Sequence, residues 1–316
     1  KQSDDNKKDI IAVIDSIFQP KEEKRSLTAK DITLNKDIKF EKYLLDDEYP
    51  YNDTVRSFQW DKIKEKLAHI DNEVAKGGSW AIFSNYRNMN GEAPTVANFV
   101  RNEYKRVSDQ YGVERYQSVP LFTPDSDTTL TRYGRDGWLV KILDSDTTEM
   151  VKVSGVSFEG EYLIPTQYLV KWGDTISLNK VVVVDVTNQN IAVLEKREDE
   201  WYILSMNPAT TGVHNPPYAL ETPVGIFAVQ EQKQKMYYTK DGSSELAGYA
   251  PFASRFTNGG YIHGVPVQYP RQSIIEWSPT LGTTPRSHMC VRNASSHSEF
   301  IYYWATVKET VVVVID

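Results

Sequence analysis

The chain has 316 residues, of which 40% are hydrophobic and 25% charged, and its formal net charge is −7. Single hydrophobic cores stop growing near roughly 250 residues, so more than one domain is expected. The acidic balance argues against a nucleic-acid partner, because polyanion-binding domains need clustered Lys and Arg. No stretch of about 18 apolar residues occurs, so no transmembrane helix is predicted. The polar opening KQSDDNKKD indicates a mature or trimmed start, for which we expect a removed export or anchor sequence.

Residues 1–112 are predicted to be a helical N-terminal region. Apolar residues recur at helical spacing over residues 10–18, 55–74 and 94–111. Gly112 is placed to cap the third of these helices at its C-terminal end.

Residues 113–173 change to short alternating apolar runs that are separated by turn signals, which predicts a small β-barrel. Asp136 and Gly137 form the dipeptide that is typical of a β-hairpin turn. The run YGRDGWLVK, followed by IPTQY, resembles the bacterial SH3-like modules that are appended to cell-wall enzymes. An unrelated five-stranded barrel fits the same composition, so both interpretations stay open.

Residues 178–316 contain stronger strand signals. A continuous β-branched run at residues 181–184 is followed by a turn at 187–190 and by further apolar runs. Another such run, at residues 311–315, is expected to tie the end of the chain into the same sheet. The predicted fold class is therefore multidomain and mainly β.

The chain has one cysteine, Cys290, so it cannot form an internal disulfide. A free cysteine is most often a small buried hydrophobe, and the chemical alternative needs a base beside it. His263 meets that need if GGYIHG, residues 259–264, ends a strand beside a cleft. Neutral imidazole can take the thiol proton and then stabilise the thiolate, so the pair needs no metal. A helix is predicted to begin near Ser296, which has capping-box spacing to Glu299.

Three motifs carry a family resemblance: ETPVGIF at residues 221–227, YIHG at 261–264 and SHMCVRN at 287–293. In this order they resemble the YkuD-type L,D-transpeptidase catalytic domain. The resemblance covers roughly residues 178–316 and implies a YkuD-like β-sandwich.

The resemblance also implies a reaction on peptidoglycan. Cys290 would attack the carbonyl that joins a diamino acid, third in a tetrapeptide stem, to the terminal D-alanine. D-alanine would leave, and an amine from a second stem would resolve the thioester. His263 would be the general base, oriented by the backbone carbonyl of Gly264, while backbone N–H groups near Met289 and Cys290 would hold the oxyanion.

Two features depart from the family pattern. Met289 stands where the family usually has Gly, so a positive φ at this position would strain the backbone. The segment between His263 and Cys290 is longer than usual, and we interpret it as a lid or a wall of the substrate groove.

Five further residues are candidates for substrate binding. Arg292 could anchor a carboxylate or carbonyl through its guanidinium, or could form a surface salt bridge. Tyr261 and Trp277 are expected to line the groove, although aromatic residues are more often core. Ser287 and His288 are expected to support the loop that carries the nucleophile.

Other histidines and cofactors are weighed against this hypothesis. His263, His288 and His297 lack zinc-ligand spacings, and no nucleotide-binding glycine loop occurs, so no metal or cofactor is predicted. His69 and His214 are interpreted as surface or satisfied residues.

The predicted function is that of a peptidoglycan L,D-transpeptidase in the bacterial cell envelope, outside the cytoplasm, with peptidoglycan stem peptides as its partners. If water resolves the thioester, the same residues give an L,D-carboxypeptidase. If Met289 disables the site, the protein is a non-catalytic wall-binding protein.

Overall fold

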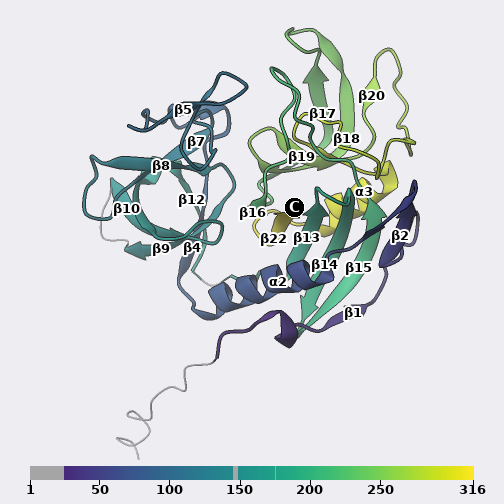
Figure 1. Ribbon diagram of the computed structural model, residues 1–316, viewed down its shortest axis with the longest axis horizontal. Coiled ribbons are helices and arrows are strands. Elements are labelled where there is room, and N and C mark those ends of the chain that lie inside the picture. Colours follow the sequence, from purple (N-terminus) through teal and green to yellow (C-terminus); the bar gives the residue numbers. More distant parts are fainter. Residues whose placement is uncertain (1–24, 145–148, 175) are drawn as a thin grey trace, which may run out of the picture.

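The computed structural model describes residues 25–144, 149–174 and 176–316 (Figure 1). These residues form a mainly β fold with two α-helices, which confirms the prediction of a mainly β protein. The helix predicted over residues 10–18 lies outside the described residues. Neither described helix has the length and apolar character that a membrane span requires.

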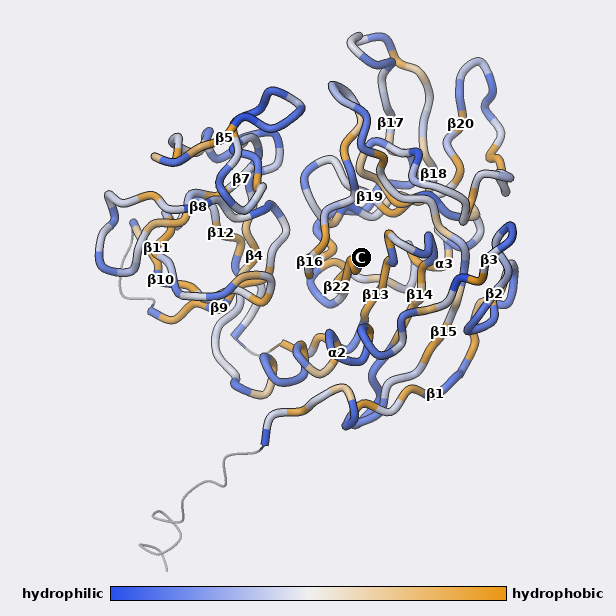
Figure 2. Tube along the Cα trace, in the orientation of Figure 1, coloured by the Kyte–Doolittle hydropathy of each residue, from blue (hydrophilic) through white to orange (hydrophobic). Residues whose placement is uncertain are grey.

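A six-stranded sheet forms the centre of the C-terminal half. Its strand order is β1 (Leu34–Lys36), β15 (Glu200–Pro208), β14 (Asn190–Arg197), β13 (Lys180–Asp185), β22 (Thr310–Ile315) and β16 (Gly225–Ala228). The last strand, β22, pairs in parallel with β13 over its whole length, as the β-branched run at its end predicted. Figure 2 shows the apolar character of these inner strands.

A second sheet packs on one face of the first and completes a β-sandwich. It contains β17 (Glu231–Thr239), β18 (Leu246–Thr257), β19 (Gly260–His263) and β21 (Val291–Arg292), with β20 (Val267–Gln268) paired to β18. Val182 and Val184 of the first sheet share a buried core with Ile262 and Val291 of the second, and with Ile301 of α3 (Ser295–Trp304).

The N-terminal segment covers the opposite face of the six-stranded sheet. Helix α2 (Trp60–Ala75) buries Ile63, Leu67 and Ile70 against a core that includes Val181 and Val183. Each such side chain contributes about 2 kcal/mol through the apolar area that it removes from water. The helix predicted over residues 55–74 is thus correct from residue 60 onward, and this segment completes the core of the C-terminal domain.

The start of α2 follows a short hairpin of β2 (Glu48–Tyr51) and β3 (Thr54–Ser57), which occupies the first residues of the predicted helix. A 3-10 turn, η1 (Ala29–Asp31), precedes β1.

A separate seven-stranded sheet forms what we call the small β module, residues 79–173. Its strand order is β12 (Leu169–Gly173), β4 (Ser79–Phe83), β9 (Leu139–Asp144), β10 (Met150–Gly155), β11 (Glu161–Pro165), β7 (Ser118–Phe122) and β8 (Leu130–Arg135). Strand β4 precedes the start predicted for this module, yet pairs with both β9 and β12. The SH3-like character of the module and the three-domain division of the chain stay predictions.

The Asp136–Gly137 dipeptide makes a turn between β8 and β9 but no hairpin. Strand β8 pairs with β7, whereas β9 pairs with β4 and β10, so the hairpin prediction is wrong. The strands diverge because the turn packs against the C-terminal domain, where the Ala228 N–H donates to the Gly137 carbonyl.

The helix predicted over residues 94–111 is also wrong. This segment contains β5 (Val100–Arg101) and β6 (Val107–Ser108), which form a short hairpin that we call the arm, residues 100–108. Asp109, 1% exposed, accepts backbone N–H bonds from Tyr111 and Val113, each at 2.9 Å, and from Tyr133 at 2.8 Å. These bonds satisfy backbone donors without a helix.

Candidate active site

Strands β19 and β21 place the predicted nucleophile and base on one face of the second sheet. They pair in parallel, with Ile262 opposite Val291 and His263 opposite Arg292. Ile262 and Val291 point into the core. Because side chains alternate along a strand, His263, Cys290 and Arg292 belong to the opposite face.

Cys290 is 8% exposed, and its Sγ donates a hydrogen bond to the Gly259 carbonyl at 3.4 Å. Burial raises the pKa of the Cys290 thiol, while a backbone N–H of Tyr261 and the charge of Arg292 act in the opposite direction. The thiol is therefore neutral near pH 7.

His263 is 3% exposed, and its Nδ1 lies 2.7 Å from the Gly264 carbonyl. A carbonyl can only accept, so Nδ1 carries the proton and Nε2 is left with a lone pair. Burial lowers the pKa of His263 to about 4, with a smaller contribution from Arg292 in the same direction. The imidazole is therefore neutral near pH 7, and Nε2 is the atom that can accept a proton.

Met289, directly before the cysteine, has φ +81° although it is not glycine. Its carbonyl accepts a 2.8 Å hydrogen bond from Thr222 Oγ1, which itself accepts one from the Gly212 N–H at 2.8 Å. A Cβ on Gly212 would lie 2.7 Å from the Met289 Cα, so only glycine permits this approach. The Ser287 hydroxyl donates to the Cys290 carbonyl. The left-handed backbone at Met289 costs roughly 1 kcal/mol. The hydrogen bonds from Thr222 and Ser287 to the carbonyls of Met289 and Cys290 hold it in place.

Arg292 is half-buried and forms no ion pair within the described residues. Its Nε is buried without a hydrogen-bond partner, and its backbone is fixed by two 2.8 Å bonds with Thr210. Burial lowers the pKa of Arg292, whose charge acts on both Cys290 and His263. The salt bridge that was the alternative for Arg292 therefore does not form among the residues that the structure describes.

The other predicted site residues contact different parts of the protein. Tyr261 clusters with Cys290, and its hydroxyl donates to Glu231 at 3.1 Å. His288 is exposed and pairs with Asp241, at the tip of the β17–β18 hairpin, at 3.0 Å. Trp277 packs against Tyr43 of the N-terminal segment, with ring centroids 4.2 Å apart and the ring planes tilted by 30°. Tyr261 thus packs beside Cys290 and Ser287 bonds to the Cys290 carbonyl, whereas His288 and Trp277 contact other elements.

The segment between His263 and Cys290 is anchored to α3. Ser296 N and Ser296 Oγ bond to the Glu276 carboxylate at 3.1 and 2.5 Å, and Ser295 N bonds to the Glu276 carbonyl at 3.0 Å. The predicted capping box is wrong, because the helix begins at Ser295 and its first N–H groups are satisfied by Glu276 rather than by Glu299.

The remaining histidines have ordinary partners. His297 is fully buried beside Ser205, at 2.8 Å, and His69 contacts the Val156 carbonyl at 2.9 Å. His214 is exposed and pairs with Glu103 and Glu221. In the part of the chain that the structure describes, no three potential ligands gather in a way that could hold a metal ion.

Sequence reasoning missed Gly259, Gly212 and Thr222. The Gly259–Gly260 pair and the threonine of ETPVGIF were visible signals, since both stand inside the recognised motifs. Gly212 lies outside these motifs and offered no local signal.

Comparison with known proteins identifies the C-terminal region. The model of the YkuD family, the L,D-transpeptidase catalytic domain, matches residues 179–314. An L,D-transpeptidase from Mycobacterium smegmatis is 18% identical with a TM-score of 0.36, over 56% of this chain and 82% of that chain. L,D-transpeptidase 3 from Mycobacterium tuberculosis is 18% identical with a TM-score of 0.34, over 56% and 77%. No curated protein sequence matches the chain, and the assignment rests on the family model.

Proposed function

We propose that residues 179–314, which belong to the YkuD family of L,D-transpeptidase catalytic domains, form a cysteine acyltransferase that acts on peptidoglycan stem peptides. The observation that carries the proposal is the pairing of β19 with β21, which puts His263, Cys290 and Arg292 on one face. Because L,D-transpeptidases act on the cell wall, the reaction would take place outside the cytoplasm.

In the first half-reaction the Cys290 sulfur attacks the carbonyl carbon of the bond to D-alanine. His263 Nε2 takes the thiol proton and then gives it to the leaving amine, so the C–N bond breaks, D-alanine departs and a thioester remains. In the second half-reaction an acceptor amine attacks the thioester carbonyl and loses a proton to His263. That proton returns to the sulfur as the C–S bond breaks.

The resting site supports proton transfer during the attack rather than before it. Burial keeps both the thiol and the imidazole neutral near pH 7, so a preformed thiolate–imidazolium pair is disfavoured. The Cys290 thiol must therefore leave the Gly259 carbonyl and turn toward His263 Nε2 when the donor stem binds.

Two groups are suited to the charges that the reaction involves. The backbone N–H groups of Met289 and Cys290 are the proposed oxyanion donors, and such a donor is worth roughly 3 to 4 kcal/mol. Arg292 is proposed to bind the carboxylate of the terminal D-alanine, since its guanidinium can form two parallel hydrogen bonds.

The experiment is incubation of the protein with a disaccharide-tetrapeptide, followed by mass spectrometry of protein and products. A protein adduct with the mass of the donor minus D-alanine is expected, and Cys290→Ala should abolish it. His263→Gln should abolish it too, while His297→Gln, which changes another buried neutral histidine, should retain it. Cross-linked dimer identifies a transpeptidase, and tripeptide alone identifies the L,D-carboxypeptidase. If a folded protein forms neither adduct nor product, the proposal is wrong, and this result supports the alternative of a non-catalytic wall-binding protein.

A further inference from the structure

The turn between β8 and β9 of the small β module is inserted into the C-terminal domain. Gly137 has φ +88°, and a Cβ there would lie only 2.0 Å from the Phe256 carbonyl. The Gly137 carbonyl accepts a 2.8 Å bond from the Ala228 N–H of β16. Glycine is required here because the two backbones touch.

Asp136, in the same turn, is fully buried, and both of its carboxylate oxygens accept hydrogen bonds. Oδ1 accepts from the Asn85 N–H at 2.9 Å. Oδ2 accepts from Arg255 Nη1 at 2.7 Å and from Gln230 Nε2 at 3.0 Å. Arg255 and Gln230 belong to the C-terminal domain, so one carboxylate joins the two parts of the protein.

The same Asp136 holds the turn between β18 and β19. Its Oδ2 accepts from the Asn258 N–H at 2.9 Å, and its carbonyl accepts from Thr257 Oγ1 at 2.7 Å. Asn258 has φ +34°, which a side chain rarely adopts unsupported. The carbonyl of the next residue, Gly259, accepts the hydrogen bond from the Cys290 thiol.

We propose that Asp136 is a positioning residue, which acts from the small β module through the turn at residues 257–260 to orient the Cys290 thiol. This inference rests on the proposed function, in which Cys290 is the nucleophile. The small β module would then help to hold the active site in place, in addition to any role of its own.

Asp136→Asn is a sharp test because the amide cannot replace the carboxylate. Every partner of the two oxygens is an N–H donor, so the new NH2 group must face a donor in either orientation. The turn is then expected to shift, and Gly259 withdraws its carbonyl from the sulfur. That carbonyl stabilises the neutral thiol, so its loss lowers the pKa at which Cys290 becomes reactive.

The measurement is the pH dependence of Cys290 alkylation by iodoacetamide, followed by intact mass on the full chain. Asp136→Asn is expected to lower the apparent thiol pKa by about 0.5 unit or more. Two other buried aspartates serve as matched controls. Asp185→Asn, at the end of β13, and Asp109→Asn, inside the module, also remove carboxylates that accept backbone N–H bonds. Both should keep the wild-type profile.

An unchanged profile in Asp136→Asn, or equal shifts in all three variants, would overturn the proposal. If Asp136→Asn does not fold, Thr257→Val tests the proposal instead. This variant removes only the hydroxyl bond to the Asp136 carbonyl and should shift the alkylation profile in the same direction. Alkylation needs no donor stem. If the wild type forms no adduct with the tetrapeptide, only the proposed function is refuted. The alkylation profiles still test whether Asp136 positions the Cys290 thiol.

Discussion

Two of the contacts between the small β module and the C-terminal domain differ in their exposure to water. The inner contact is the pair of Asp136 and Arg255, whose side chains are 0% and 9% exposed. The outer contact joins the arm to a loop through His214, which lies 2.8 Å from Glu103 and 2.5 Å from Glu221. The His214 side chain is 42% exposed.

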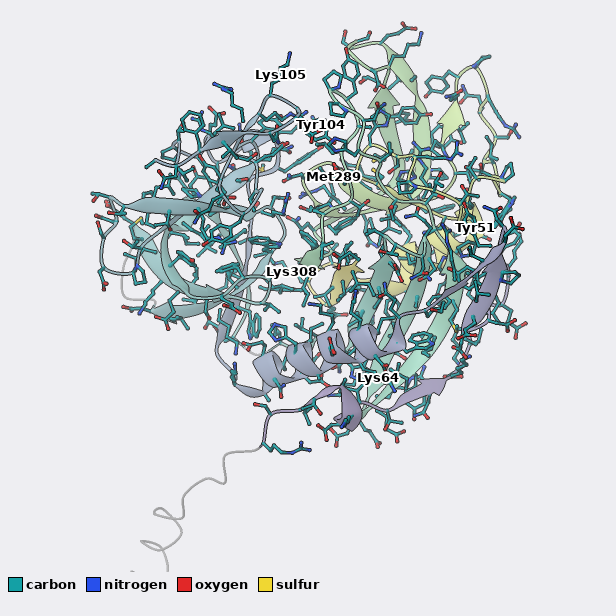
Figure 3. The ribbon with its side chains drawn as sticks, viewed as in Figure 1. Tyr51, Lys64, Tyr104, Lys105, Met289 and Lys308 are labelled. Carbon is teal, nitrogen blue, oxygen red and sulfur yellow. The ribbon has the colours of Figure 1, made fainter. Side chains whose placement is uncertain are left out.

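Each contact is connected to the loop that carries Cys290 through a different set of hydrogen bonds. The inner one acts through the turn that ends at Gly259. The outer one includes Tyr104, labelled in Figure 3, whose hydroxyl donates to Glu221 at 2.8 Å. The neighbouring Thr222 holds the Met289 carbonyl.

Among the histidines, burial decides the sign of the response to pH. His263 and His297 are buried, and desolvation lowers the pKa of these two groups to about 4 and about 3. His214 is exposed between two glutamates, whose hydrogen bonds raise the pKa of its imidazole. Acid should therefore weaken the folded core and tighten the outer contact.

The largest expected effect is acid destabilisation of the core. Below pH 6.5 the unfolded chain protonates His263 and His297 while the folded chain does not, so stability falls as the pH falls. Between pH 7 and pH 5 the two groups together should cost about 4 kcal/mol. Denaturant titrations at several pH values measure this loss. His297→Gln should reduce the loss by roughly half, and an unchanged pH slope in that variant would contradict the prediction.

A smaller loss is expected when the inner contact is broken. Arg255→Met leaves Asp136 buried without its cationic partner, which should lower the free energy of unfolding by about 3 kcal/mol. The control is Lys240→Met, since the Lys240–Glu245 pair is exposed on both sides and should matter little. Equal losses of stability in the two variants would show that the inner contact has no special weight.

The strained backbone beside the nucleophile should have an effect near 1 kcal/mol. Met289→Gly and Met289→Ala both remove the side chain, but only alanine keeps a Cβ at φ +81°. The glycine variant should be the more stable by about 1 kcal/mol, which reverses the usual order of these residues. Thermal unfolding compares them directly. If alanine is equally or more stable, the loop is not strained as its dihedral angles indicate.

The sequence was informative where a local pattern is sufficient. The β-branched runs at 181–184 and 311–315 predicted strands that lie side by side in the sheet. The motifs around His263 and Cys290 pointed to the family that the match over residues 179–314 confirms. In each case the signal stands within a few residues of the feature that it predicts.

The failures share a different cause, which is that the deciding partner is distant in sequence. Asp136 suggested a hairpin turn, yet its conformation depends on Arg255, 119 residues later. Ser296 suggested a capping box, but Glu276 satisfies the helix. Residues 94–111 have helical spacing, but Asp109 binds the N–H of Tyr133 from another strand. Such contacts exist only after the fold has formed.

The smallest expected effect is at the outer contact, where the sign is opposite to that of the core. Because Glu103 and Glu221 raise the pKa of His214, the contact is fully present below about pH 6.5 and is lost as the pH rises through the folded value. Tyr104 also faces this imidazole, with its hydroxyl 3.1 Å from Nδ1. The arm should therefore be held more firmly at pH 6 than at pH 8.

Hydrogen exchange of the arm amides at residues 102, 105 and 106, corrected for the intrinsic effect of pH, measures how firmly the arm is held. The wild type should show greater protection at pH 6, and His214→Gln should show the same protection at both pH values, because glutamine carries no charge. His288→Gln is the matched control, since His288 is another exposed histidine, paired with Asp241. If His214→Gln keeps the wild-type difference, the outer contact does not respond to pH, and burial no longer explains why exposed and buried histidines respond to pH with opposite signs.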